Sequence, residues 1–137
     1  KKGTFIGSAV SSDGVNFLIE KGKRFKEKGT DFKDCAVVFF KGQWHMITPS
    51  HNRDGKGYYA TSNDGLNFIR KNDVRVKVKG DWLGNIVIQD GDVYFFGTGF
   101  VAKTNDFNDW EVISRHRLQD PAVIFSKGKT IVVSTTE

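Results

Sequence analysis

Residues 34–42 read Asp-Cys-Ala-Val-Val-Phe-Phe-Lys-Gly, and residues 120–128 read Asp-Pro-Ala-Val-Ile-Phe-Ser-Lys-Gly. The two stretches align without a gap, and each continues into a second apolar run, at 43–47 and 129–133. A Lys-Gly pair separates the two runs in both copies, and Gly readily adopts the positive φ that a two-residue hairpin turn needs. The repeat therefore predicts the same β-hairpin twice in one chain.

Two further observations extend the repeat. A third copy runs through 85–96, with Asp90-Gly91 in the place of the Lys-Gly turn. A second kind of hairpin, built around a Ser-x-Asp-Gly turn, repeats at 58–68 and 5–17, with a looser copy at 101–110. In chain order the repeats are an outer hairpin at 4–19, two complete four-stranded units at 34–69 and 83–112, and an inner hairpin at 120–136.

This order predicts an all-β fold, a β-propeller of three four-stranded blades in a single domain spanning 1–137. One blade is split between the two ends of the chain, or is completed by a second chain. Because unpaired strand edges invite association, we expect 4–19 to pair with 120–136. That pairing closes a three-bladed ring within one chain or a six-bladed ring of two chains, a homodimer. The alternative is a β-sandwich in which the similarity of the hairpins is coincidental.

The composition limits which kinds of fold and which kinds of functional site this chain can have. The 137 residues include 12 Phe and 15 Gly but only two Pro, which suits short strands and tight turns. The single cysteine, Cys35, excludes an intrachain disulfide. No metal-ligand spacing appears, and no apolar run is long enough to span a membrane. We therefore expect no metal, cofactor or membrane partner. No leader segment is apparent, and the compartment is open between cytoplasm and secretion.

In a propeller blade, the innermost strands begin on one face, at the mouth of the central channel, and the loops between the second and third strands lie on the same face. Asp34 and Asp120 begin two such strands, and the loop 48–57 and Glu137 are expected beside them. Most of the Lys and Arg residues behind the net charge of +5 lie in the connections that reach this face, 20–33, 70–82 and 113–119. A cationic rim favours an anionic ligand, although solvation of exposed loops explains the same charge without a partner.

Three stretches resemble a known group of enzymes. Asp-Pro-Ala-Val-Ile-Phe at 120–125 resembles the strand openings of five-bladed propeller glycoside hydrolases, which include arabinanases, β-xylosidases and fructosidases. Residues 34–46 are similar to the blade that carries their base or nucleophile, and 59–68 to their outer hairpin. The Ser-x-Asp-Gly turn also resembles the structural Asp boxes of sialidases. The resemblance spans nearly the whole chain through short motifs.

The resemblance implies a hydrolase with three carboxylates at the channel mouth. One acts as base or nucleophile, one as acid, and one orients or tunes the acid. By the match, Asp34 is the candidate base and Asp120 a second catalytic or orienting carboxylate. No Glu matches the acid position, and Glu137 is a further catalytic candidate only because the loop 48–57 returns to the same face. The middle unit departs from the pattern, because Leu83 or Asn85 stands where an Asp is expected and Asp81 is out of register.

The remaining candidates are contacts to a ligand. The sequence places five candidate substrate-binding residues near the same face, His51, Arg53, Trp82, Asn85 and Arg117. We expect a carbohydrate, or an anionic small molecule or polymer, as the partner. The alternatives are a propeller that binds such a ligand without chemistry and a structural assembly protein. A strand-opening Asp that only accepts hydrogen bonds from loop amides is the structural explanation for Asp34 and Asp120.

Overall fold

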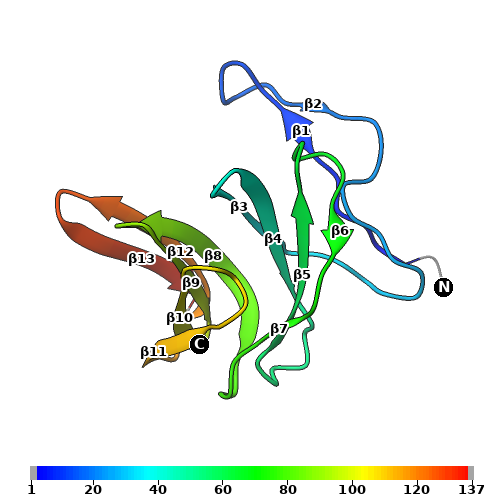
Figure 1. The fold of residues 1–137 in the computed structure, drawn as a ribbon. Coiled ribbons are helices and arrows are strands. Elements are labelled where there is room, and N and C mark those ends of the chain that lie inside the picture. The colour runs from blue at the N-terminus through cyan, green and yellow to red at the C-terminus, as the bar shows by residue number, and fades with distance from the viewer. Residues whose placement is uncertain (1–2, 136–137) are drawn as a thin grey trace.

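The protein is all-β, as predicted. Its structure, a computed structural model, describes residues 3–135 and contains thirteen strands and no helix in that range. The strands form four separate sheets, none of which is closed on itself (Figure 1). Two are larger antiparallel meanders, and two are isolated hairpins near the ends of the chain.

The two larger sheets follow one another along the chain. In the first sheet, strands pair in chain order, and a short fifth strand pairs with the far end of β5; its members are β3 (Ala36–Phe40), β4 (Gln43–Pro49), β5 (Lys56–Ser62), β6 (Ile69–Arg70) and β7 (Val74–Arg75). The second sheet is a four-stranded meander of β8 (Asp81–Gln89), β9 (Asp92–Thr98), β10 (Phe100–Thr104) and β11 (Glu111–Arg115).

The two hairpins do not meet. The N-terminal hairpin consists of β1 (Ala9–Val10) and β2 (Leu18–Ile19), and the C-terminal hairpin of β12 (Gln119–Ser126) and β13 (Lys129–Thr135). Among the described residues, β1 pairs only with β2 and β13 only with β12. Figure 1 shows the two larger sheets lying between the hairpins. The expected pairing of 4–19 with 120–136 is therefore not made within the described part of the chain, because the sheets hold its two halves apart.

Strand register repeats along with the sequence. Ala36 pairs with Ile47 in the first sheet, and their equivalents Ala122 and Val133 pair in the C-terminal hairpin. The pairing between β8 and β9 has the same register around its own turn. Both residues have positive φ in all three turns, as a type I′ hairpin requires: Lys41–Gly42, Asp90–Gly91 and Lys127–Gly128.

The second kind of hairpin repeats with equal fidelity. Ala60 pairs with Arg70 in the first sheet, and the equivalent residues Ala9 and Ile19 pair in the N-terminal hairpin. In the turn after β5, the Asp64 carboxylate accepts hydrogen bonds from the backbone and the side chain of the residue three positions on, and from the Ser62 hydroxyl. The Asp13 turn makes the same bonds, whereas Asp106 accepts from the backbone N–H groups of Asn108 and Asp109 and from the Thr104 hydroxyl. These bonds hold the pKa of the turn Asp well below its usual range at Asp13 and Asp64 and lower it at Asp106. The Ser-x-Asp-Gly motif is thus a turn-forming device.

The main core lies between the two larger sheets. Ile47 and Tyr59 from the first sheet pack in one cluster with Trp82, Phe95 and Phe100 from the second. Trp82 is fully buried, its ring makes edge contacts with both Phe rings, and its Nε1–H donates to the carbonyl of Gly55 at 2.9 Å. A smaller cluster packs the N-terminal segment against the first sheet and comprises Ile6, Phe25, Phe32, Met46 and Ala60.

Candidate functional site

The loop between β4 and β5, residues 50–55, is fixed against the start of the second sheet. The backbone N–H of Gly55 donates to the carbonyl of Gly80 at 3.0 Å, and Gly80 N–H donates to the carbonyl of Arg53 at 3.2 Å. Gly55 has φ +77°, and a Cβ there would lie 2.2 Å from the carbonyl oxygen of Val76. Only glycine fits this close approach, so the loop lies tightly against the segment 76–80 that leads into the second sheet.

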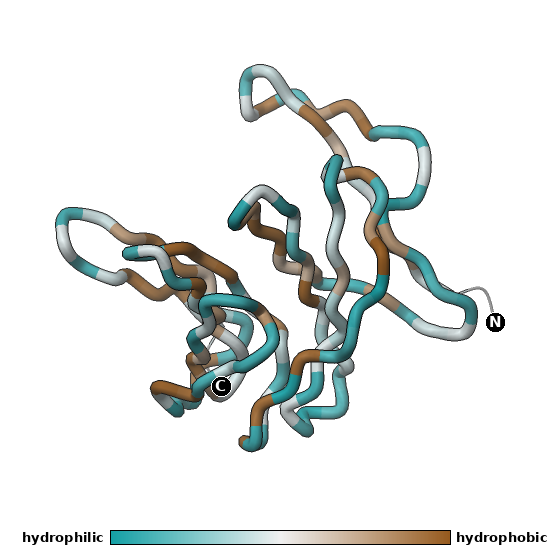
Figure 2. Tube along the Cα trace, in the orientation of Figure 1, coloured by the Kyte–Doolittle hydropathy of each residue, from teal (hydrophilic) through white to brown (hydrophobic). Residues whose placement is uncertain are grey.

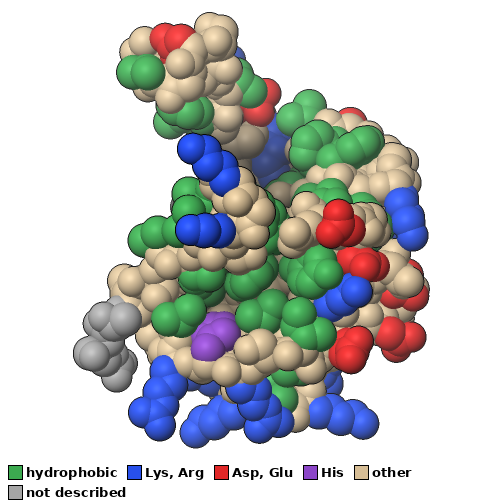
Figure 3. Space-filling view, turned by 90° about the vertical axis from the view of Figure 1, so that its left-hand side faces the viewer, with side chains coloured by type: hydrophobic (Ala, Val, Ile, Leu, Met, Phe, Trp, Pro, Cys, Tyr) green, Lys and Arg blue, Asp and Glu red, His purple; other side chains and the backbone are tan. Residues whose placement is uncertain are grey.

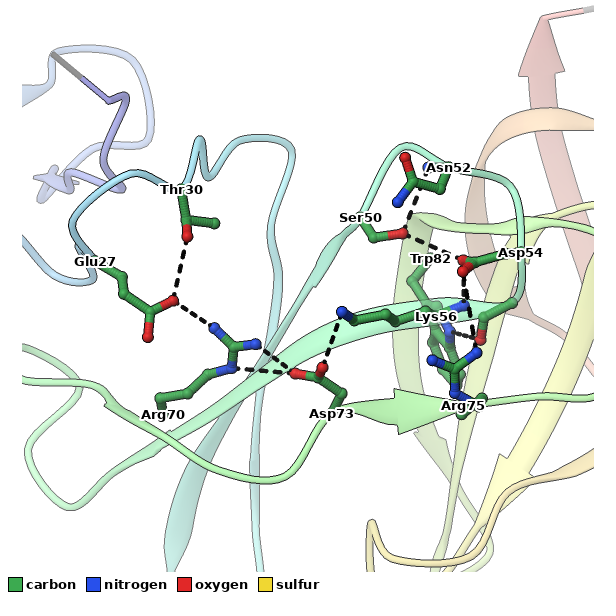
Figure 4. A network of polar contacts seen from close by, with 11 residues as sticks. Glu27, Thr30, Ser50, Asn52, Asp54, Lys56, Arg70, Asp73, Arg75 and Trp82 are labelled. Carbon is green, nitrogen blue, oxygen red and sulfur yellow. Dashed lines mark hydrogen bonds and ion pairs between the residues drawn. The ribbon is translucent and has the colours of Figure 1, made fainter. Parts of the chain in front are cut away.

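Polar side chains hold the same loop from within (Figure 4). The Asp54 carboxylate accepts hydrogen bonds from the backbone N–H of Lys56 at 3.1 Å and from the Ser50 hydroxyl at 3.4 Å. Beyond the loop, Asp73 forms ion pairs with Lys56 and Arg70. These contacts fix the backbone of the loop, and the loop in turn positions the ring of His51.

His51 lies between two carboxylates from different sheets. Its Nε2 is 3.8 Å from Oδ2 of Asp34, just before β3, and its Nδ1 is 3.9 Å from Oδ2 of Asp81, the first residue of β8. The three side chains differ in exposure, at 48% for Asp34, 33% for His51 and 6% for Asp81. The imidazole of His51 thus has a half-exposed carboxyl group on one side and a buried carboxyl group on the other.

Asp81 is the buried carboxyl of the three. Burial raises its pKa, and the nearby charges of His51 and Arg53 and the N–H of Trp82, which donates to Oδ1 at 3.0 Å, only partly offset this. Buried carboxyls with raised pKa values recur at sites of proton transfer.

Asp34 and Asp120 have equivalent backbone conformations. Both are non-glycine residues at positive φ, 54° and 44° respectively. Asp is one of the few side chains that tolerate this region, and a residue held there points away from the direction that a regular strand gives it. The side chain of Asp120 is exposed, and its backbone N–H donates to the hydroxyl of Thr98 at 3.1 Å. Thr98 pairs with Asp81 across β8 and β9, so the three Asp residues belong to one end of the molecule.

One more expected residue, Arg53, joins this end. The Arg53 guanidinium donates to the side-chain carbonyl of Gln119 at 3.1 Å, which links the loop 50–55 to the start of β12. We call Asp34, His51, Arg53, Asp81 and Asp120 the mouth cluster. Three separate strand starts and one loop supply it, and sequence reasoning had placed four of its members on a common face.

The other candidate residues have different surroundings. Trp82 is fully buried and packs in the core, so its ring does not line a surface. The side-chain oxygen of Asn85 accepts a hydrogen bond from the backbone N–H of Val123 at 3.1 Å and thereby positions the C-terminal hairpin on the second sheet. Arg117 is exposed on the connection to β12. Glu137 lies outside the described residues.

Asp81 is the residue that sequence reasoning set aside as out of register. A register shift between Asp81 and Gly84, where Gly84 has φ +154°, inserts extra residues at the start of β8. The shift carries Asp81 back to the level of the other strand starts. Gly84, two residues after a Trp at a strand opening, is the sequence signal for this irregularity.

A cationic groove adjoins the mouth cluster. Its volume is about 380 Å³, and its charged lining consists of Arg53, Asp54, Arg75, Lys77 and Lys79. Figure 3 shows Lys and Arg side chains gathered along the lower edge of the molecule. A larger cavity, about 700 Å³, lies elsewhere, among Gln43, Lys71 and Asn108, and contains no member of the mouth cluster. The cationic groove, in contrast, shares Arg53 with the cluster.

Comparisons with known families and with curated proteins found no match. No protein-family model matches the sequence, and no curated protein is significantly similar to it. Across residues 3–135, no group of three or more His, Cys, Asp or Glu side chains is arranged to hold a metal ion. That same stretch contains no helix of the length and apolar character needed to cross a membrane.

Proposed function

We propose that the two larger sheets and the two terminal hairpins are the blades and half-blades of a β-propeller, three blades per chain, and that the mouth cluster hydrolyses a glycosidic bond. The repeated registers and the face-to-face packing of consecutive sheets support the propeller. The resemblance of 34–46 and 120–125 to propeller glycoside hydrolases supports the chemistry. The observation that carries the proposal is the position of His51, with the carboxylates of Asp34 and Asp81 within 4 Å of its two ring nitrogens.

Glycosidic bond hydrolysis needs a base that activates water and an acid that protonates the leaving oxygen. In this proposal Asp34, the half-exposed carboxylate, is the base. Asp120, exposed at the equivalent strand start, is the acid that protonates the leaving oxygen. Asp81, which holds its proton more tightly than an ordinary Asp, tunes the charge of the cluster through His51.

The test is hydrolysis of a panel of aryl glycosides and polysaccharides, followed by release of chromophore or reducing ends. The Asp34→Asn variant removes the base and should lower any activity at least about 100-fold, because general base catalysis typically contributes that much. Asp109→Asn is the matched control, since Asp109 is exposed beside the turn after β10, outside the mouth cluster. It should keep full activity.

Three results would count against the proposal. One is the absence of activity toward every substrate in the panel. Another is equal activity of Asp34→Asn and the wild-type protein. The third is a loss of thermal stability in Asp34→Asn that accounts for the loss of activity, which would make Asp34 a structural hydrogen-bond acceptor.

A second candidate function is binding of an anionic glycan or polymer without chemistry. The cationic groove favours it, because Arg53, Arg75, Lys77 and Lys79 contribute four positive side chains against the single carboxylate of Asp54. Binding to heparin or polygalacturonate should weaken steeply as salt increases, and Lys77→Glu with Lys79→Glu should abolish it. If the protein ignores both polymers at low salt, the groove is merely solvated.

A further inference from the structure

The cavity of about 700 Å³ lies between the two larger sheets, apart from the mouth cluster. β4, β5 and the connection from β6 to β7 form one side of it, and the turn after β10 forms the other. Its volume is typical of small-molecule sites, which measure about 300–1,000 Å³. The proposed hydrolysis gives it no role. We call it the amide cavity, because its lining includes the side-chain amides of Gln43, Asn72 and Asn108.

The inner wall of the amide cavity is part of the packed core. The ring of Phe107 stacks on the rings of His45 and Tyr59, with centroids 3.9 and 5.5 Å apart, and all three side chains are buried. The backbone N–H of Lys71 donates to the carbonyl of Tyr59 at 2.8 Å, which fixes the connection after β6 against β5. The cavity is therefore bounded by packed side chains and hydrogen-bonded backbone, and it is already formed without a ligand, as most small-molecule sites are.

Phe107 is also the point at which one of three equivalent turns departs from the other two. Gly14 and Gly65 occupy this position at φ +74° and +72°, and Phe107 keeps the same conformation at φ +66°. A bulky side chain rarely adopts this region, and residues held in it are frequent at ligand-binding sites. The side chain of Phe107 contributes to the lining of the amide cavity, which a glycine in its place would not do.

The charges that line the amide cavity leave one cation available to a ligand. Arg70 forms ion pairs with Glu27 and Asp73, as Figure 4 shows. Across residues 3–135, none of the ion pairs includes Lys71, whose exposed side chain lines the cavity. Figure 2 shows the connection between β6 and β7 as a hydrophilic stretch at this point. A ligand with one negative charge would therefore complement the lining.

The uncharged polar groups of the lining favour a ligand with many hydroxyl groups. Gln43, Asn72 and Asn108 reach the cavity from three different segments, and Thr61 adds a hydroxyl. A side-chain amide both donates and accepts hydrogen bonds, as a sugar hydroxyl does, so the two groups can pair in either direction. The Gln43 amide is oriented in advance, because it donates to the side-chain oxygen of Asn63 at 3.1 Å.

We propose that the amide cavity binds a sugar acid. The carboxylate of the ligand pairs with the Lys71 ammonium, and its hydroxyl groups form hydrogen bonds with the side-chain amides. A neighbouring hollow of about 290 Å³ shares Gln43, Thr61 and Lys71 with the cavity, which gives the ligand space to extend by a further sugar. The site shares no residue with the mouth cluster, so it binds its ligand whether or not the cluster is catalytic.

Titration of the full chain with glucuronate, glucose and acetate, followed by two-dimensional NMR spectra of the backbone amides, tests both the ligand and its location. Glucuronate should shift the signals of Lys71, Asn72 and Asn108. Glucose and acetate should bind at least about tenfold more weakly, because each lacks part of the ligand and hydrogen bonds to charged groups contribute at least that much. Shifts confined to Lys77 and Lys79 would place glucuronate in the cationic groove and overturn the proposal.

Two variants separate the carboxylate contact from general electrostatic attraction. Lys71→Gln should weaken glucuronate binding at least about tenfold and leave glucose binding unchanged, because it removes the charge and keeps a polar side chain. Lys77→Gln is the matched control, since Lys77 is an exposed lysine of the cationic groove, outside the amide cavity, and it should bind glucuronate as the wild type does. Equal affinity of Lys71→Gln and the wild type, equal affinity for glucose and glucuronate, or no binding of glucuronate would each overturn the proposal.

Discussion

The first sheet and the C-terminal hairpin contain the same local structure in opposite surroundings. β3–β4 and β12–β13 share sequence, register and turn geometry. Ile47 is fully buried against the second sheet, however, whereas its equivalent Val133 is mostly exposed. The local sequence therefore specifies the hairpin itself, whereas the neighbouring sheet determines how much the apolar face of the hairpin contributes to the free energy of folding.

The largest expected effect comes from truncating this pair of equivalent residues. Ile47→Ala should lower the free energy of unfolding by about 2–5 kcal/mol, because it leaves a cavity in the core between the sheets. Val133→Ala should change it by no more than about 0.5 kcal/mol in dilute protein, because no packed neighbour is lost. Urea denaturation followed by tryptophan fluorescence measures both. Equal effects at the two positions would mean that the C-terminal hairpin is covered even in the dilute protein.

A second pair of substitutions compares glycines at positive φ. Gly55→Ala should cost several times as much as Gly128→Ala, since a Cβ at 55 meets the carbonyl of Val76 whereas a Cβ at 128 meets nothing within 4 Å. The expected loss at 128 is about 1 kcal/mol, from the positive φ alone. Thermal denaturation of the two variants gives the comparison. A stable Gly55→Ala protein would show that the loop 50–55 moves away from the second sheet at low cost.

The smallest expected effect is on pH dependence at another equivalent pair, His45 and Ile131. His45 is buried beside Phe107, its Nδ1 lies 2.8 Å from the Tyr59 hydroxyl, and burial lowers its pKa below the ordinary value of 6.5. The unfolded chain therefore binds a proton as pH falls through 6.5 while the folded protein does not, so stability falls in that direction. The slope is limited to about 1.4 kcal/mol per pH unit for one group, and ends at the lower pKa of the folded state.

The variant that tests this replaces His45 with Ile, the residue at the equivalent position 131 of the C-terminal hairpin. His45→Ile, made together with Tyr59→Phe so that no hydroxyl is left without a partner, should remove this slope between pH 6.5 and the lower pKa of His45. Denaturation midpoints of variant and wild type across that window supply the difference, in which the contribution of Asp81 cancels. An unchanged slope would assign the dependence to another group.

Sequence reasoning reached the elements whose information is local. The type I′ turns at Lys41-Gly42 and Lys127-Gly128 were predictable because two residues at positive φ leave a plain sequence signal. The all-β class followed from the repeats of those turns. Whether the two terminal hairpins pair with one another was not predictable. That outcome depends on how the sheets pack, and the packing involves side chains far apart in sequence.

The residues of the candidate site also differ in this respect, because some were predictable from local sequence and others were not. Asp34, Asp120, His51 and Arg53 were expected at one end, because strand starts and the loop between β4 and β5 share that end in any meander. Asp81 was missed because its place depends on a register shift next to Gly84, and the equivalent positions of the other repeats hold Cys35 and Pro121 instead of glycine. Trp82 was expected to touch a ligand, but its indole N–H is used by Gly55 and its ring by the core.

The matching registers of the hairpins and sheets have a consequence for how such a chain can change in length. A whole four-stranded unit inserted between β7 and β8 would lengthen the array and leave both terminal hairpins as they are. Because each unit carries its own turn and register signals, gene duplication within the array would add a sheet without requiring a new kind of strand pairing.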